Sequence, residues 1–186
     1  ELNVKFPAAE PKIAMNAETS YYYAMNVLNG PFKAGEPAIA QDAYWAGQYA
    51  WTVLGARFEA GEPVIATNSK TAGDYAENVI KGRWTVGEPA IAQDAEESFY
   101  YAKAVLNGPF KTGESAIAKN PRYAARYAVE VLSGPFKAGE PAIATSADAS
   151  YSYARYALKG PFKAGEPAIA KEAFWSREYK KFIRKK

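Results

Sequence analysis

Glutamates at a regular spacing are the first residues of this chain that could do chemistry. One stands at the same place in every 26-residue interval: Glu10, Glu36, Glu62, Glu88, Glu114, Glu140 and Glu166. Acid–base catalysis uses two carboxylates in different environments, and a hard-cation site needs several oxygens that converge within one loop. Seven near-identical surroundings and no Asp-rich loop therefore favour a structural role, at the positive N-terminal end of a short helix.

Other residue types narrow the chemistry further. The chain has no cysteine and no histidine, which removes disulfides, thiolate chemistry, the usual zinc and haem ligands and the side chain best suited to proton transfer at neutral pH. No glycine-rich phosphate loop or GxSxG elbow is present. The sequence therefore predicts a protein that is not an enzyme and has no metal, no cofactor and no catalytic residues.

Charge and hydropathy indicate a soluble protein. No run approaches the ~18 consecutive apolar residues of a membrane helix, so we expect no membrane partner. The formal net charge is +3. From Arg177 onward six basic residues face one acidic residue, whereas the preceding chain carries 17 basic against 19 acidic residues, a net of −2. The basic character therefore belongs to a tail.

A tyrosine column shares the period of the glutamates. Its members are Tyr23, Tyr49, Tyr75, Tyr101, Tyr127, Tyr153 and Tyr179. Each lies in the middle of an apolar stripe, so we expect the rings in the core, with the hydroxyl reaching a backbone group or water.

The same period defines the organisation of the chain. Isoleucine followed by alanine occurs at 13, 39, 65, 91, 117, 143 and 169, and an aromatic column runs through Phe6, Phe32, Phe58, Trp84, Phe110, Phe136 and Phe162. We expect one domain, residues 1–186, of seven repeats: 7–32, 33–58, 59–84, 85–110, 111–136, 137–162 and 163–186.

Each repeat is predicted to hold a short helix at "EPAIA" and a longer second helix of about three turns. Apolar residues at i, i+3, i+4, i+7 and i+8 from position 20 onward place a stripe on one face of the second helix. Its expected N-terminal positions are Asn16, Asp42, Asn68, Asp94, Asn120, Ser146 and Glu172, of which six are favoured caps. The expected left-handed terminators are Gly30, Gly82, Gly108, Gly134 and Gly160.

Such a helical hairpin is too small to bury its own apolar face, so stacked copies must share one core. The predicted fold class is all-α, an α-solenoid. In the last repeat Lys180 replaces a small residue and Arg184 replaces a leucine, and Lys185 and Lys186 follow. This composition predicts a polar cap.

The repeats carry a resemblance. "GPFKAGEPAIAQDAYWAGQYAWTVLG" and "GPFKTGESAIAKNPRYAARYAVEVLS" are similar to the short "GEPAIA"-type tandem helical repeats of uncharacterised proteins from tailed bacteriophages, over essentially the whole chain. The resemblance implies a viral protein that acts in the cytoplasm of a bacterial host, and it implies no mechanism.

Function is expected on the face of the second helix that points away from the stripe. Tyrosine, tryptophan, methionine and arginine recur there, and these types are enriched in protein interfaces. The predicted partner-binding residues are Tyr22, Tyr44, Trp45, Trp51, Tyr100, Lys103, Arg122, Arg126 and Arg155.

Three functions remain open from the sequence. The first is a non-enzymatic scaffold that binds a host or viral protein. The second is a reader of single-stranded RNA, in which a few side chains per unit address one base; acidic residues such as Asp74 and Glu77 on the same face oppose phosphate contact. The third is a structural protein that stacks end to end. The oligomeric state is not predicted.

Overall fold

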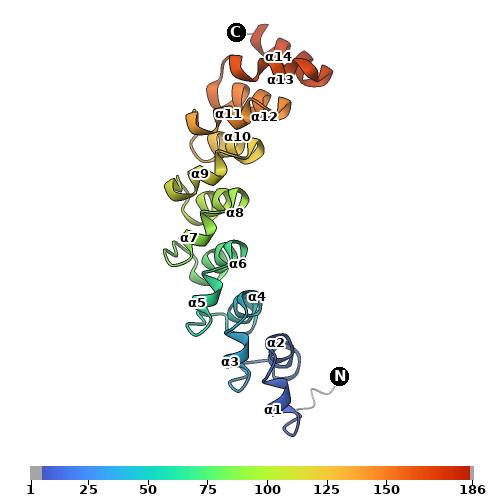
Figure 1. The fold of residues 1–186 in the computed structure, drawn as a ribbon, viewed down its shortest axis with the longest axis vertical. Coiled ribbons are helices and arrows are strands. Elements are labelled where there is room, and N and C mark those ends of the chain that lie inside the picture. Colours follow the sequence, from blue (N-terminus) through green and yellow to red (C-terminus); the bar gives the residue numbers. More distant parts are fainter. Residues whose placement is uncertain (1–5, 185–186) are drawn as a thin grey trace. The chain divides into compact units, whose positions relative to one another are not determined.

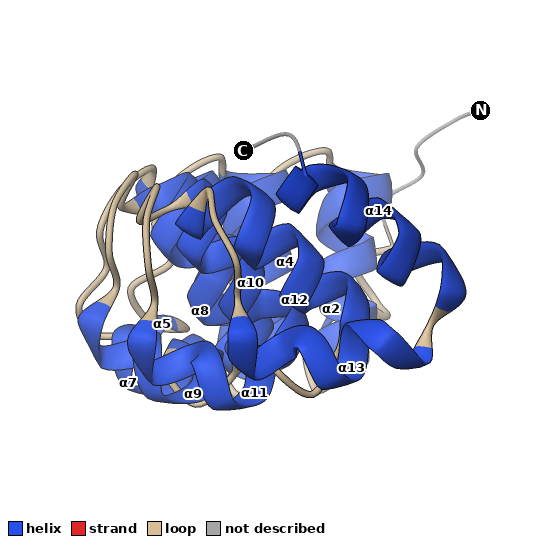
Figure 2. Ribbon diagram, turned by 90° about the horizontal axis from the view of Figure 1, so that it is seen from above, coloured by secondary structure: helices blue, strands red, loops and turns tan. Residues whose placement is uncertain are grey.

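The computed structural model describes residues 6–184, and within that range it contains helices and loops but no strand (Figures 1 and 2). The predicted all-α solenoid of 26-residue repeats is confirmed. A short helix opens each repeat. These are α1 (Glu10–Ile13), α3 (Glu36–Ile39), α5 (Glu62–Ile65), α7 (Glu88–Ile91), α9 (Glu114–Ile117), α11 (Glu140–Ile143) and α13 (Glu166–Lys171). A 3₁₀ turn precedes three of them: η5 (Lys111–Gly113), η6 (Lys137–Gly139) and η8 (Lys163–Gly165).

A longer second helix completes each repeat, and in five repeats it changes from α to π geometry. These are α2 (Ala17–Tyr23) with η1 (Ala24–Leu28), α4 (Ala43–Gln48) with η2 (Tyr49–Leu54), α6 (Ser69–Tyr75) with η3 (Ala76–Ile80), α8 (Ala95–Tyr100) with η4 (Tyr101–Val105), and α12 (Ala147–Ser152) with η7 (Tyr153–Leu158). Two remain α-helical, α10 (Pro121–Glu130) and α14 (Ala173–Arg184). The apolar stripe alone predicted plain α-helices, because it does not report the hydrogen-bond register.

The helix starts agree with the predicted caps. The side chains of Asn16, Asp42, Asn68, Asp94 and Asn120 accept hydrogen bonds from backbone N–H groups two or three residues later. Ser146 has the extended backbone of a cap, but its hydroxyl donates to Asp148 instead. The capping oxygens satisfy N–H groups that a first helical turn leaves without an intrahelical partner.

The helix ends correct the sequence prediction by one residue. The left-handed residues are Asn29, Gly55, Lys81, Asn107, Ser133 and Lys159, so the predicted Gly30, Gly82, Gly108, Gly134 and Gly160 each follow the terminator. The N–H of Gly30 bonds back to the carbonyl of Ala24, 3.1 Å away. The N–H of Asn29 bonds to the same carbonyl, and the left-handed conformation of Asn29 lets the following glycine reach back to it as well.

Contacts divide the chain into two compact units, Glu1–Ile91 and Ala92–Lys186. In the first unit, second helices α2, α4 and α6 are successive neighbours, and each also packs against the short helix that follows it (Figure 1). In the second unit, α8, α10, α12 and α14 are arranged in the same way. Each unit therefore presents a row of second helices.

The core is built from the invariant columns. Ile39, Ile65, Ile117 and Ile143 are fully buried, and so are the rings of Tyr49, Tyr127 and Tyr153. The glycine that caps a short helix lies so close to the preceding second helix that an added carbon at Gly35 would sit 2.5 Å from Ser20 Oγ. Glycine at this position thus sets the distance between neighbouring elements.

Candidate functional site

The tyrosine and glutamate columns form one hydrogen-bonded framework. The Tyr75 hydroxyl donates to Glu62 Oε1 at 2.8 Å and accepts from the N–H of Phe58 at 3.0 Å. The same bridge is made by Tyr23, Tyr49, Tyr127, Tyr153 and Tyr179. Burial raises the pKa of Tyr75 to about 12. Each of these tyrosines therefore joins its second helix to the preceding short helix and to the aromatic turn before that helix.

Cations on the loop edge complete this framework. Arg57 pairs with Glu62 through Nε and Oε1, 2.7 Å apart, and its hydrogen bonds hold the pKa of the Glu62 carboxyl below its usual range. Lysines at the equivalent edge pair with their own glutamates, as Lys33 does with Glu36 at 2.9 Å. The glutamate column is thus engaged in structural contacts on both sides.

The described part of the chain contains neither a cluster of metal ligands nor a helix that could cross a membrane. Across residues 6–184 no three acidic side chains gather closely enough to hold a metal ion. In the same range no helix combines the length and the apolar character that a membrane crossing requires.

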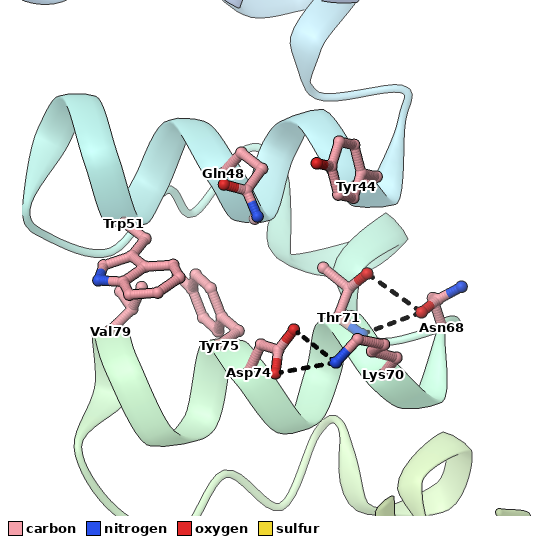
Figure 3. Close-up of a pocket in the computed structure, with 10 residues that line it drawn as sticks. Tyr44, Gln48, Trp51, Asn68, Lys70, Thr71, Asp74, Tyr75 and Val79 are labelled. Atoms are coloured by element: carbon pink, nitrogen blue, oxygen red, sulfur yellow. Dashed lines mark hydrogen bonds and ion pairs between the residues drawn. The ribbon is translucent and has the colours of Figure 1, made fainter.

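A groove of about 270 Å³ lies in the first unit, between α4–η2 and α6–η3 (Figure 3). One wall carries Tyr44, Gln48 and Trp51 at positions i, i+4 and i+7. Residues Tyr44 and Trp51 are 55% and 49% exposed, so both predicted anchors face solvent, and both line the groove.

The opposite wall of this groove comes from the third repeat. Asn68, Lys70, Thr71, Asp74, Tyr75 and Val79 line it. Lys70 and Asp74 form an ion pair of 3.3 Å along the rim. Figure 3 shows Trp51 above Val79 and Tyr75 at one end, and Tyr44 above Thr71 at the other. The groove therefore combines aromatic ends with a polar middle.

The size of one facing pair decides whether neighbouring second helices leave a groove. Gly47 faces Thr71, and an added carbon on Gly47 would sit 2.5 Å from Thr71 Cγ2. Where the equivalent pair is aromatic, rings fill the space: Tyr21–Trp45 at 5.1 Å, Phe99–Tyr123 at 5.8 Å and Tyr151–Trp175 at 5.2 Å between centroids. Small pairs leave grooves, and aromatic pairs close them.

A second groove, of about 310 Å³, obeys the same rule in the second unit. Its facing pair is Ala125 and Ala149, between α10 and α12. The rest of its lining is mostly charged or polar. It comprises Arg122, Arg126, Val129, Glu130, Asp148, Ser152 and Tyr156. Arginines thus occupy the positions held by Tyr44 and Gln48 in the first groove.

Two other predicted residues of the first unit belong to an aromatic cluster. Trp45 is half-buried, with ring centroids of Tyr21, Tyr22 and Tyr44 within 5.5 Å. Tyr22 is exposed at its edge. Trp45 is therefore a packing residue between two repeats, and Tyr22 and Tyr44 present the accessible rings.

Two of the predicted partner-binding cations, Lys103 and Arg126, share one carboxylate. Glu130 accepts from Lys103 at 2.6 Å and from Arg126 at 2.7 Å. The Arg126 guanidinium lies 4.3 Å above the centre of the buried Phe99 ring and 5.6 Å from that of Tyr100, which is exposed. These contacts support a cation–π arrangement. Glu130 was not among the residues predicted from sequence, although Arg126 and Glu130 have the i, i+4 spacing of a helical ion pair.

The last two predicted cations differ in their surroundings. Arg122 is exposed beside the Tyr123 ring, at 5.7 Å, and lines the second groove. Arg155 stacks between Tyr151 and Tyr156 and donates to the Tyr151 hydroxyl. Both arginines are exposed, so both remain available to a partner.

The last repeat carries the residues predicted as a polar cap. Lys180 and Arg184 are exposed, whereas Ala154, equivalent to Lys180 one repeat earlier, is fully buried. Lys185 and Lys186 lie outside the described residues. A groove of about 360 Å³ between α13 and α14 is lined by Ile169, Tyr179 and Ile183, among others.

Fold and grooves together define the class of protein: an α-solenoid of short helical hairpins with grooves between selected second helices. Comparison with models of protein families, with curated proteins and with solved structures found no match.

The residues of the first groove that were not predicted as site residues are Gly47, Gln48, Asn68, Lys70, Thr71, Asp74, Tyr75 and Val79. A usable signal was present, because the column of Gly47 holds Tyr21, Phe99 and Tyr151 in other repeats. Comparing facing columns for size, rather than reading each helix alone, would have located both grooves.

Proposed function

We propose that this chain is a non-enzymatic scaffold that binds a protein partner through the row of second helices, with the α4–α6 groove as its principal site. The observation that carries the proposal is the pair Tyr44 and Trp51, two half-exposed rings at opposite ends of one groove. Aromatic anchors in pockets supply much of the binding energy of protein interfaces. Because the repeats resemble those of bacteriophage proteins, the proposed partner is a bacterial or viral protein and the proposed compartment is the host cytoplasm.

The electrostatics of the first unit favour a protein over RNA. Residues 1–91 hold seven basic against ten acidic residues, a formal net charge of −3. Nucleic-acid binding relies on cations that contact phosphates, and Asp74 stands on the rim of the groove. The exposed rings could stack on bases, but the surrounding charge opposes the phosphate backbone.

Affinity capture from bacterial extract, with and without phage infection, tests the proposed function. The tagged chain is compared with the double variant Tyr44→Ala, Trp51→Ala and with Phe174→Ala, which removes a residue of similar exposure (55%) from the second unit, outside the grooves. We expect the chain and Phe174→Ala to retain one partner, identified by mass spectrometry, and the double variant to lose it. Equal capture by the double variant, with an unchanged circular dichroism spectrum, contradicts the proposal.

A further inference from the structure

The spacing of the two groove rings selects one backbone conformation of an extended partner. Tyr44 and Trp51 are seven residues apart, about 10 Å along a helix at ~1.5 Å per residue. In a polyproline II segment the side chains return to one face every three residues, or about 9 Å at ~3.1 Å per residue. A β-strand returns every two residues, about 6.6 Å. The rings therefore match successive turns of a polyproline II helix better than a strand.

A partner α-helix would match the ring spacing equally well, because its residues seven apart span the same distance. The polar middle of the groove distinguishes between the two partner conformations. The Gln48 side chain lines the groove and lies between Tyr44 and Trp51 along α4–η2 (Figure 3). An apolar helix face would bury this amide without a partner, at a cost of about 1–3 kcal/mol. A polyproline II segment has no internal hydrogen bonds, so its carbonyls are free to accept from the Gln48 amide.

The charge around the groove indicates which residues should flank the bound segment of the partner. The Lys70 ammonium pairs with Asp74 on the rim. Glu77 is exposed three residues farther along the same helix, in a unit with a net charge of −3. A neutral proline-containing core flanked by lysine or arginine complements this surface, whereas an acidic segment is repelled.

From these three features we infer that the α4–α6 groove binds a proline-containing segment in the polyproline II conformation with a basic flank. Aromatic-lined grooves suit such segments because proline rings pack on flat aromatic faces and the chain is already ordered before binding. The inference rests on the proposed function and names the chemistry of the partner.

Titration with synthetic peptides, followed by calorimetry, tests the inference. The probes are a proline-rich peptide with lysines at both ends, the same peptide with glycine in place of proline, and an amphipathic helical peptide of equal charge. We expect the proline-rich peptide to bind at least about tenfold more tightly than the glycine peptide. Trp51→Ala and Tyr44→Ala should each weaken binding about tenfold, and Gln48→Met several-fold, while Phe174→Ala, an exposed ring outside the grooves, leaves it unchanged. Melting curves confirm that each variant is folded.

Several outcomes separate this inference from the proposed function. Binding of the helical peptide alone, with loss in Trp51→Ala, overturns the polyproline inference and leaves the protein-binding scaffold standing. Proline-rich peptide binding that Trp51→Ala does not weaken places the site elsewhere and overturns the inference. Absence of binding by all three peptides also overturns it. In that case the capture experiment decides separately whether the groove binds a protein.

Discussion

The hydroxyl of Tyr49 lies 3.0 Å from Oε1 of Glu36, to which it donates a hydrogen bond. It also accepts one from the N–H of Phe32, again at 3.0 Å. Glu36 begins a short helix, Tyr49 lies in the following second helix, and Phe32 anchors the turn before both. One buried hydroxyl therefore ties together three segments of a repeat, and this accounts for the invariance of both columns within the chain.

Removing this hydroxyl should destabilise the protein without changing its fold. Tyr49→Phe keeps the fully buried ring but leaves the buried N–H of Phe32 without its acceptor. We expect a loss of about 1–3 kcal/mol in the free energy of unfolding, measured by urea denaturation. Tyr44→Phe is the matched control on an exposed ring, with an expected change within about 0.5 kcal/mol. Equal effects of the two variants would show that the bridge adds nothing to stability.

Glycines in this chain should respond differently to the same substitution. An added carbon at Gly35 meets Ser20 Oγ and Phe32 Cδ1, both at 2.5 Å, whereas at Gly82 nothing lies within 4 Å. Gly35→Ala should therefore lower the free energy of unfolding by about 1–3 kcal/mol through overpacking. Gly82→Ala should leave it unchanged or raise it slightly. Thermal melts of the two variants provide the comparison, and a stable Gly35→Ala protein would contradict the close approach.

Alkaline pH should unfold the protein through its tyrosines. Burial raises the pKa of Tyr75 to about 12, above the value of about 10 of an unfolded chain. Between these values the unfolded state gives up the proton that the folded state keeps, so stability present below pH 10 is lost as pH rises toward 12. Urea midpoints from about pH 8 to about pH 12 should fall steeply.

Lysines also lose their charge in this pH range, so a variant is needed to assign the effect. Tyr75→Phe removes one of the titrating groups and leaves every lysine in place. Its midpoints should start lower than those of the native chain and decline less steeply above pH 10. An identical decline in both proteins would assign the alkaline loss to the lysine ion pairs.

The sequence alone supports the fold because its period is strict. Seven copies of one pattern define the short helix, the second helix and the buried tyrosine. Hydrogen-bond register is a weaker signal, and this explains two differences. The π geometry at the end of α2 and the left-handed conformation of Asn29 both depend on which carbonyl the N–H of Gly30 reaches. Side-chain periodicity does not encode that choice.

The candidate site is less predictable, because it depends on pairs of residues in neighbouring repeats. Tyr44 and Trp51 face solvent as the helical wheel predicts. Whether a groove lies beside them depends on Gly47 and Thr71, which belong to different helices and different columns. The neutralisation of Lys103 by Glu130 likewise spans 27 residues. One helix read alone contains neither relationship.

Trp45 should affect stability more than binding, contrary to its assignment from sequence as a partner contact. Its ring centroid lies 5.1 Å from that of Tyr21, and Tyr21 is buried and shares a hydrogen bond of 3.1 Å with Thr52. A double-mutant cycle of Tyr21→Ala and Trp45→Ala should give a coupling energy of about 0.5–1.5 kcal/mol in the free protein. The rings of Tyr44 and Trp51 stand at opposite ends of the groove, so the same cycle for that pair should give a coupling near zero in stability. Absence of coupling between Tyr21 and Trp45 would mean that their stacking does not hold the first two repeats together, and Trp45 would return to the set of binding residues.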